Sequence, residues 1–322
     1  MSNSIPLRGF GTFQADSSVY PPGTAKKGVL TALKAGYRHI DTAYAYSSGE
    51  IEREVGEAIR ESGIPREDLF VVTKLHNTFH APEDVQVGID FSLRNLGLDY
   101  VDLYLMHNPY AYAKGPDFST LRRPDGSGKP VIDLELSRKY PETWKAMAAL
   151  IPAGKTPLGV SNFNILKTKR LIEETGIVPT ANQVEMNPYF PQFELLDFCK
   201  ANGIQVIAHC PLGGALSPSV TNREGPGPLE DPVIKSIAIA HGKTAAQIIL
   251  AWLTGWGICV VPKSADPMRI ESNFDMLFPL SKEEGAQIAN LVGPRGELGM
   301  RNLDNRHHIG FDIFDEHVDQ PA

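Results

Sequence analysis

Short apolar runs with the composition of β-strands alternate with longer amphipathic stretches along most of this 322-residue chain. Between the runs, apolar residues recur at helical spacing, as at Ile51, Val55 and Ile59. Strands that are apolar throughout and separated by helices are typical of a parallel sheet covered by helices. The clearest runs are rich in β-branched and aromatic residues and span 69–73, 101–106, 204–208 and 258–262.

Further weak runs continue the same alternation at 7–11, 37–41, 157–161 and 180–185. The total of eight strands predicts a closed (β/α)8 barrel, formed as one domain over residues 1–322. An open, doubly wound sheet is the alternative. Its GxGxxG fingerprint is missing after the first strand, because the segment that begins at Gly9 reads GFGTFQ.

Composition narrows the class of protein. The net charge of −7 argues against a nucleic-acid-binding surface, which would be basic. No apolar run approaches the ~20 residues that span a bilayer, and the first residues lack a secretory signal pattern, so we expect a cytoplasmic location. The three cysteines, Cys199, Cys210 and Cys259, form no CxxC pair, which predicts reduced thiols and no metal site.

Long insertions follow two of the strands, at 108–139 and 211–230, and a polar segment at 292–322 ends the chain. Loops of this length are often functional. Insertions that follow strands lie on the C-terminal face of a barrel, where barrel enzymes keep their active sites. We therefore expect the functional site at that face.

Ionisable side chains stand where consecutive strands end. Asp41 ends the second strand and Tyr46 follows it, Lys74 ends the third, and His107 follows the fourth. Each alone has an ordinary structural explanation, as a cap, a core residue or a rim charge. Barrel geometry brings all four to one mouth, which favours a catalytic set.

This set suits one kind of chemistry. A tyrosine with a pKa near ~10 is a poor acid at neutral pH, and a neighbouring lysine ammonium lowers that pKa. Asp41 would keep Lys74 charged, and His107 would hydrogen-bond the reacting oxygen. The arrangement fits protonation of a carbonyl oxygen while hydride reaches carbon, and it lacks the nucleophile–base pair of a hydrolase.

Six segments in order resemble the aldo-keto reductases: GYRHIDTAYAY, VVTKLH, DLYLMHNP, GVSNFN, NQVEMNPY and VVPKSADPMRIESNF. The resemblance runs from about Leu7 to Leu291. It implies a (β/α)8 barrel that reduces aldehydes or ketones reversibly with NADPH, and it implies Tyr46 as general acid with Lys74, Asp41 and His107 around it. It also implies contacts to the nicotinamide and its ribose from Thr12, Asp41, Ser161, Asn162, Gln183 and His209, and a contact to the pyrophosphate from Leu212.

The same resemblance assigns the adenosine 2′-phosphate to Lys263, Ser264 and Arg269, and the adenine to Asn273. The chemistry agrees, because two cations and a hydroxyl beside a helix N-terminus form an anion site. An NAD ribose site would carry an acid there instead. We therefore expect NADPH as the cofactor.

The chain departs from the family pattern at the pocket. Phe13, His76 and Asn108 stand where larger aromatic residues are usual, and His209 replaces the aromatic ring that stacks on the nicotinamide. This predicts a polar pocket for a hydroxylated carbonyl compound, unless the 108–139 insertion supplies new walls. In the C-terminal segment Met300 and Arg301 are candidates for the substrate loop, whereas His307 and His308 are expected to be solvated.

The prediction is thus an NADPH-dependent reductase of a small carbonyl substrate, monomeric or homodimeric, without nucleic-acid or membrane partners. Two other functions stay open. A cofactor-binding regulatory or scaffold protein would keep the barrel without needing all four strand-end residues. A phosphosugar isomerase would need a glutamate base and a substrate phosphate site.

Overall fold

The computed structural model describes residues 4–14, 20–150, 156–214 and 225–303. Eight parallel strands form one sheet, in the order β1-β2-β3-β4-β7-β8-β9-β10. A parallel bridge between Arg8 and Val260 joins the first strand to the last and closes the barrel. The strands are β1 Gly9–Gly11, β2 His39–Asp41, β3 Phe70–Leu75, β4 Leu103–Met106, β7 Leu158–Ser161, β8 Ala181–Glu185, β9 Gln205–His209 and β10 Cys259–Val260. Each overlaps one of the predicted runs, with β3 and β9 extending past the predicted ends, so the predicted barrel is confirmed.

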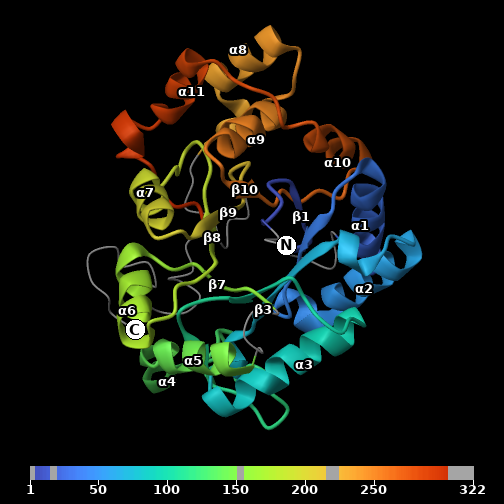
Figure 1. Ribbon diagram of the computed structural model, residues 1–322, viewed down its shortest axis with the longest axis vertical. Coiled ribbons are helices and arrows are strands. Elements are labelled where there is room, and N and C mark those ends of the chain that lie inside the picture. Colours follow the sequence, from blue (N-terminus) through green and yellow to red (C-terminus); the bar gives the residue numbers. More distant parts are fainter. Residues whose placement is uncertain (1–3, 15–19, 151–155, 215–224, 304–322) are drawn as a thin grey trace.

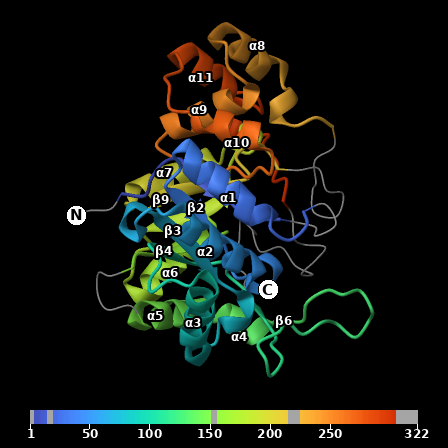
Figure 2. The same ribbon diagram turned by 90° about the vertical axis from the view of Figure 1, so that its right-hand side faces the viewer.

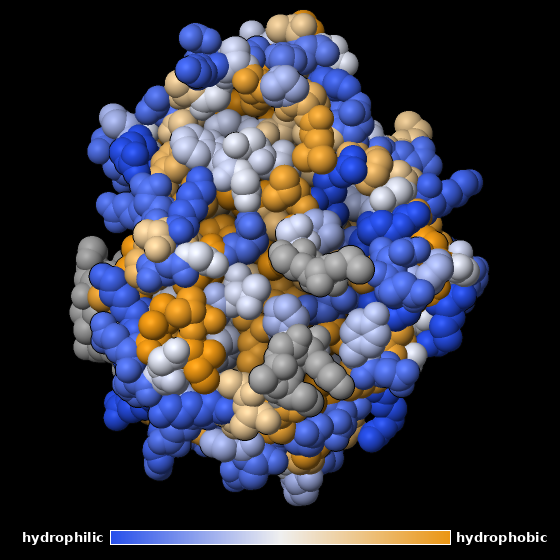
Figure 3. All heavy atoms as spheres, viewed as in Figure 1, coloured by the Kyte–Doolittle hydropathy of each residue, from blue (hydrophilic) through white to orange (hydrophobic). Residues whose placement is uncertain are grey.

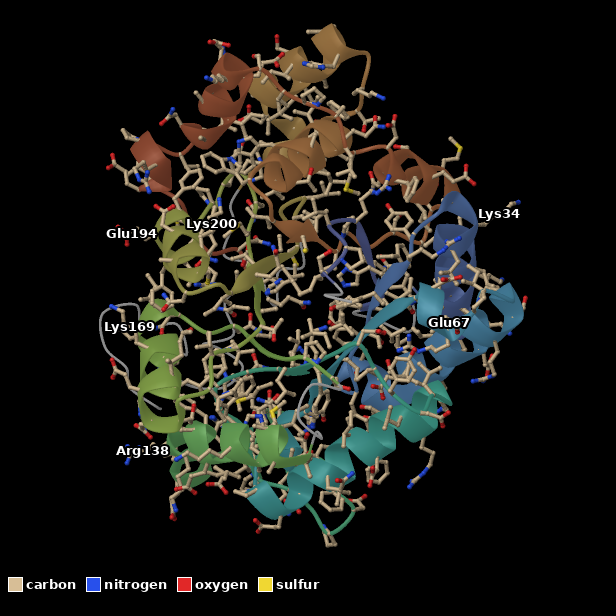
Figure 4. The ribbon with its side chains drawn as sticks, in the orientation of Figure 1. Lys34, Glu67, Arg138, Lys169, Glu194 and Lys200 are labelled. Atoms are coloured by element: carbon tan, nitrogen blue, oxygen red, sulfur yellow. The ribbon has the colours of Figure 1, made fainter. Side chains whose placement is uncertain are left out.

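Helices surround the sheet, as Figure 1 shows in the view down the shortest axis. They follow the strands in the βα alternation that the sequence predicts. The helices are α1 Thr24–Ala35, α2 Glu50–Ser62, α3 Val85–Leu96, α4 Leu134–Arg138, α5 Tyr140–Leu150, α6 Ile165–Thr175, α7 Phe193–Ala201, α8 Pro232–His241, α9 Ala245–Gly255, α10 Pro267–Phe274 and α11 Lys282–Ala289. Figure 4 shows that the labelled charged side chains, such as Lys34 and Glu194, project outward from this ring.

Local sequence explains where helices begin and end. In α2 the predicted apolar stripe is buried, with Val55 fully enclosed, and Gly63 ends the helix with φ +67°, a conformation that favours glycine. Helix α11 begins with a capping box, in which the Glu284 amide donates to Ser281 Oγ at 3.1 Å and the Ser281 amide donates to Glu284 Oε2 at 2.8 Å.

The pleat of each strand divides the core into two layers. Residues such as Val71 and Leu75 point outward into the large cluster beneath the helices. Phe70 and Val72 point inward into a smaller cluster inside the barrel. Because side chains alternate along a strand, every second residue of β3 faces the interior, and Lys74 continues that inward row.

The same alternation operates in the neighbouring strands. Leu103 and Leu105 of β4 face the interior, and His107 follows them at the same parity. In β8 the interior residue Ala181 is followed at even spacing by Gln183 and Glu185. The interior is therefore apolar along most of its length and becomes polar where the strands end. This change of chemistry places the candidate site at the C-terminal mouth.

The 108–139 insertion carries secondary structure of its own. It contains a short antiparallel pair, β5 Ala111–Tyr112 with β6 Ile132–Asp133, and then helix α4, which Asp133 caps. Backbone hydrogen bonds continue beyond this pair of strands, as in the bond from the Leu121 amide to the Ala113 carbonyl at 3.0 Å. Figure 2 shows the chain beside β6 projecting from the barrel. The insertion is thus a hydrogen-bonded hairpin, where the sequence analysis expected a long loop.

Other general predictions can be compared with the described residues. None of their helices is both long enough and apolar enough to cross a membrane, and no group of three metal-binding side chains is found among them. Cys199, Cys210 and Cys259 are free thiols, and burial raises the pKa of each to about 12. The face in Figure 3 is largely hydrophilic at its rim, with hydrophobic residues gathered nearer its centre.

Candidate active site

Lys74 forms the centre of the strand-end cluster. Its side chain is only 1% exposed, and its Nζ donates to Asp41 Oδ1 at 2.7 Å, to the Thr42 carbonyl at 2.9 Å and to the Tyr46 hydroxyl at 3.4 Å. All three ammonium protons therefore have partners. The predicted Asp41–Lys74–Tyr46 arrangement is present.

Burial and charge oppose each other in this cluster. Burial alone would lower the pKa of Lys74, but Asp41 and Tyr46 raise it above the ordinary value. For Tyr46 burial is the larger influence and raises the pKa, while Lys74 lowers it. The sequence analysis expected the lysine to lower the tyrosine pKa, and burial outweighs that effect. Tyr46 accordingly holds its proton at neutral pH and shares a hydrogen bond with a fixed cation.

His107 lies against Tyr46, with ring centroids 6.1 Å apart and the rings edge to face. Burial, reinforced by Lys74, holds the pKa of His107 well below its ordinary value, so the ring stays neutral. Its Nδ1 has no partner among the described residues. A neutral imidazole carries one N–H, which can donate to an oxygen placed beside the Tyr46 hydroxyl.

Amide and hydroxyl groups extend the cluster across the mouth. Gln183 Nε2 donates to Asp41 Oδ2 at 2.6 Å, and Ser161 Oγ donates to the Gln183 carbonyl at 2.9 Å. Thr12 Oγ1 donates to the Asp41 carbonyl at 2.9 Å. Thr12, Ser161 and Gln183 are buried, so these groups have fixed orientations. The structure therefore brings these predicted cofactor residues to the Lys74 cluster.

Asn162 adopts φ +63°, in the left-handed region that asparagine enters more readily than most non-glycine residues. Its Nδ2 donates to the His107 carbonyl at 3.0 Å and to Asn108 Oδ1 at 3.1 Å. Its Oδ1 lies 3.1 Å from His209 Nε2. Burial lowers the pKa of His209 to about 3, so this ring is neutral and its Nε2 donates to Asn162.

The predicted anion site follows β10 and includes the start of α10. Lys263 lies with its Nζ 3.3 Å from the centre of the Tyr20 ring, and Arg269 is the most open of the set, with 79% of its side chain exposed. Asn273 is 5% exposed, and its side-chain amide makes no hydrogen bond with the described residues. Elsewhere at the mouth, Leu212 is half-buried against the core.

The predicted pocket residues surround Tyr46 unevenly. Phe13 is 53% exposed, and its ring meets that of Tyr46 edge to face at 5.1 Å. Half-buried His76 lies beside Tyr112 of the hairpin, with ring centroids 5.8 Å apart. Buried Asn108 donates from Nδ2 to Asn77 Oδ1 at 3.2 Å.

Tyr112 and Asn77 contact the predicted pocket residues His76 and Asn108, and the sequence analysis did not name them. The alternation of strands carries no signal for them, because they lie in a hairpin and a strand-end turn. Tyr112 belongs to β5 and Asn77 to a turn after β3. The sequence analysis left open that the 108–139 insertion supplies pocket walls, and Tyr112 belongs to that insertion.

The C-terminal segment is held at the mouth by a buried carboxylate. The backbone amides of Asn302 and Leu303 donate to the two oxygens of Glu185, at 3.0 and 2.9 Å. Asn302 Nδ2 also donates to the Gly213 carbonyl at 3.0 Å, in the loop after β9. The sequence analysis missed Glu185 and Asn302, although Glu185 continues the inward row of β8.

The residues predicted for the substrate loop precede this anchor. Met300 is 70% exposed, and the Arg301 guanidinium lies 4.6 Å from the centre of the Phe190 ring. His307 and His308 lie outside the described residues.

Comparison with known proteins agrees with this geometry. The model of the Aldo/keto reductase family matches residues 9–292. Glycerol 2-dehydrogenase (NADP(+)) of Saccharomyces cerevisiae is 42% identical over 91% of this chain and 89% of its own length. The enzyme of the same name from Hypocrea jecorina is 41% identical over 97% of this chain and 95% of its own.

Solved structures agree as well. Aldose reductase from Schistosoma japonicum superposes with a TM-score of 0.83 at 34% identity, covering 98% of this chain and 97% of that one. An aldo-keto reductase from Bombyx mori in complex with NADP gives 0.79 at 35% identity, covering 95% and 93%. The chain therefore belongs to the aldo/keto reductase family.

Proposed function

We propose that this chain reduces a small hydroxylated aldehyde or ketone to the alcohol, reversibly and with NADPH, and that Tyr46 is the proton donor. The enzyme class and the NADP cofactor follow from the family and from relatives named as NADP(+) enzymes. The chain is thus an NADP-dependent oxidoreductase of carbonyl compounds. A regulatory or scaffold role without chemistry is not favoured, since all four strand-end residues are in contact at one mouth.

One observation carries the catalytic proposal: the Lys74 Nζ that contacts both Asp41 and Tyr46 in a buried site. When the substrate oxygen lies between Tyr46 and neutral His107, His107 donates a hydrogen bond and Tyr46 donates its proton. Lys74 then stabilises the phenolate that forms, because its ammonium already contacts the hydroxyl oxygen. Asp41 keeps Lys74 charged throughout. NADPH, when bound, supplies the hydride.

The residues present fit this cofactor. Lys263, Ser264 and Arg269 offer the cationic and hydroxyl donors that a 2′-phosphate requires, and the buried Asn273 amide has its hydrogen-bonding groups available among the described residues. The donors and acceptors of Ser161, Asn162 and Gln183 would hold the carboxamide, and Thr12 and Asp41 would hold the ribose. Leu212 would contact the pyrophosphate and His209 the nicotinamide. These assignments form part of the proposal.

Polar groups near the reacting site support a hydroxylated substrate. Asn108, His76 and Asn77 make this region more polar than an aromatic-lined pocket, although the amides of Asn108 and Asn77 bond to each other and to neighbouring protein groups. Two similar proteins are named for oxidation of glycerol at its second carbon. We therefore propose a triose-sized hydroxy-ketone or hydroxy-aldehyde as the substrate class.

The remaining parts of the function also stand as proposals. We propose one catalytic domain over residues 1–322, a cytoplasmic location and a monomeric or homodimeric state. Neither a nucleic acid nor a membrane is a proposed partner.

The decisive test is the Tyr46→Phe variant, assayed for NADPH consumption with dihydroxyacetone and glyceraldehyde. We expect at least a thousandfold loss of turnover, since the proton donor is removed, while the dissociation constant for NADPH stays within about threefold. Tyr100→Phe, on the outer surface beside Arg66, is the matched control and should retain wild-type turnover. Turnover near the wild-type rate in Tyr46→Phe would refute the assignment.

A further inference from the structure

An acidic side chain stands within the predicted phosphate site. Asp266 precedes α10 as its N-cap, and its Oδ1 accepts from the Met268 amide at 2.9 Å and from the Arg269 amide at 3.3 Å. A helix N-terminus attracts anions through such free amides. Here a fixed carboxylate already occupies two of them, so a phosphate at this position meets a negative charge and fewer open donors.

The same carboxylate contacts other members of the predicted site. Asp266 Oδ2 lies 3.8 Å from Arg269 Nε, and the Asp266 amide donates to Ser264 Oγ at 3.1 Å. Lys263 instead lies against the ring of Tyr20, and among the described residues Lys263 makes no ion pair with Asp266. One of the two cations expected to face the phosphate therefore already has a carboxylate beside it before any nucleotide binds.

NADPH and NADH differ only at the 2′-oxygen of the adenosine ribose. NADPH carries a 2′-phosphate, which cations and amides bind, whereas NADH carries a free 2′-hydroxyl, which can donate a hydrogen bond to a carboxylate. This site holds both kinds of group side by side. The buried Asn273 amide, without a partner among the described residues, can contact either nucleotide.

We propose that Asp266 determines cofactor specificity, by weakening the binding of the 2′-phosphate and by accepting a hydrogen bond from the 2′-hydroxyl of NADH, so that the preference for NADPH over NADH is reduced. The proposal rests on the proposed function, because it assumes that the cofactor's ribose lies between Ser264 and Arg269. Asp266 is a specificity residue and has no part in the proton transfer at Tyr46.

The test compares the binding affinities of the two nucleotides and does not depend on catalytic turnover. NADPH and NADH are titrated separately into the full-length wild type and into Asp266→Asn, with isothermal calorimetry as the readout. Asparagine keeps an oxygen to cap α10 and removes the charge. One carboxylate against a phosphate in water corresponds to about a tenfold change in affinity. We therefore expect the ratio of the NADH to the NADPH dissociation constant to rise about tenfold.

A matched control is available in the same fold. Asp231 caps α8 in the same manner, with Oδ1 accepting from the Val233 amide at 2.8 Å and from the Ile234 amide at 3.3 Å. Asp231→Asn should leave the nucleotide ratio unchanged, which separates charge at the phosphate site from general loss of a helix cap. Asp266→Ser, which also caps a helix, should change the ratio in the same direction as Asp266→Asn.

The outcomes are distinguishable. A ratio that stays within twofold of wild type in both Asp266 variants would overturn the proposal, and so would a loss of NADPH affinity, which would mean that Asp266 orients Arg269 toward the phosphate. A ratio that rises at low salt and returns toward wild type at high salt supports it, since salt screens exposed charges. Wild-type protein that binds neither nucleotide would refute the proposed function itself.

Discussion

Removing the buried lysine of the active site should destabilise the whole fold as well as stop the reaction. Lys74→Met deletes the cation that contacts Asp41 and leaves that carboxylate in a site where its side chain is 4% exposed. Asp41 Oδ2 keeps its hydrogen bond from Gln183, but Oδ1 loses the lysine. An uncompensated buried charge of this kind costs about 3–5 kcal/mol, against a typical total of about 5–15 kcal/mol for a folded domain.

A second substitution tests whether the cost comes from the charge. Asp41→Asn in the Lys74→Met background removes the unpaired charge and keeps an oxygen for Gln183. We expect the double variant to be more stable than Lys74→Met alone by at least about 2 kcal/mol, although both are inactive. The free energy of unfolding is measured by urea titration of each single variant, the double variant and wild type, followed by circular dichroism.

An exposed pair provides the control for this cycle. Lys139 and Glu135 lie 2.8 Å apart on α4, with 46% and 82% of their side chains exposed, and Lys139→Met should leave the unfolding midpoint unchanged. Additive losses at Lys74 and Asp41 would refute the reasoning, because they would show that the two charges do not depend on each other. A Lys74→Met variant as stable as wild type would refute it as well.

Further predictions concern other parts of the mouth. Buried His80 has a pKa lowered to about 3, and neither ring nitrogen has a partner among the described residues. The unfolded chain protonates this group below about pH 6.5, so the stability that His80 contributes is full above that pH and falls by about 2 kcal/mol at pH 5, in addition to the losses from His107 and His209, whose pKa values are also lowered. His80→Leu should remove only the His80 contribution from the pH profile of urea unfolding. Glu185→Gln should increase hydrogen exchange at the Asn302 and Leu303 amides, measured by mass spectrometry, because a neutral acceptor binds them less strongly, and unchanged exchange would contradict the anchoring role. Arg269→Ala should weaken NADPH binding at least tenfold and NADH binding less than threefold in fluorescence titration, whereas equal losses would contradict the phosphate assignment.

The regular part of this fold is readable from the sequence because it depends on periodicity. Eight apolar runs gave the eight strands, and the alternation along β3 and β4 brought Lys74 and His107 to the same mouth. The hairpin within 108–139 was missed because its pairing is short and its residues carry no apolar alternation, so a strand pattern is absent. What holds it is backbone pairing and the Asp133 cap, which only the structure shows.

Energetic balance was harder to predict than placement. The sequence places Lys74 beside Tyr46, and contact alone suggests a lowered tyrosine pKa. The outcome depends on how completely the barrel encloses the hydroxyl, and burial raises the pKa more than the lysine lowers it. Glu185 was missed for a related reason: an acid at a strand end has many uses, and its bonds to residues far along the chain leave no local pattern.

The position of Asp41 explains why Tyr46, the proposed proton donor, and the groups proposed to bind the carboxamide should not vary independently. One oxygen of its carboxylate accepts from Lys74 and the other from Gln183, while the Gln183 carbonyl accepts from Ser161. Because the donors of these three hydrogen bonds, Lys74, Gln183 and Ser161, are all buried, a change at one bond shifts the others without water to compensate. A substitution at Gln183 therefore alters the field at Tyr46 through Asp41 and Lys74, although Gln183 makes no direct contact with the tyrosine among the described hydrogen bonds.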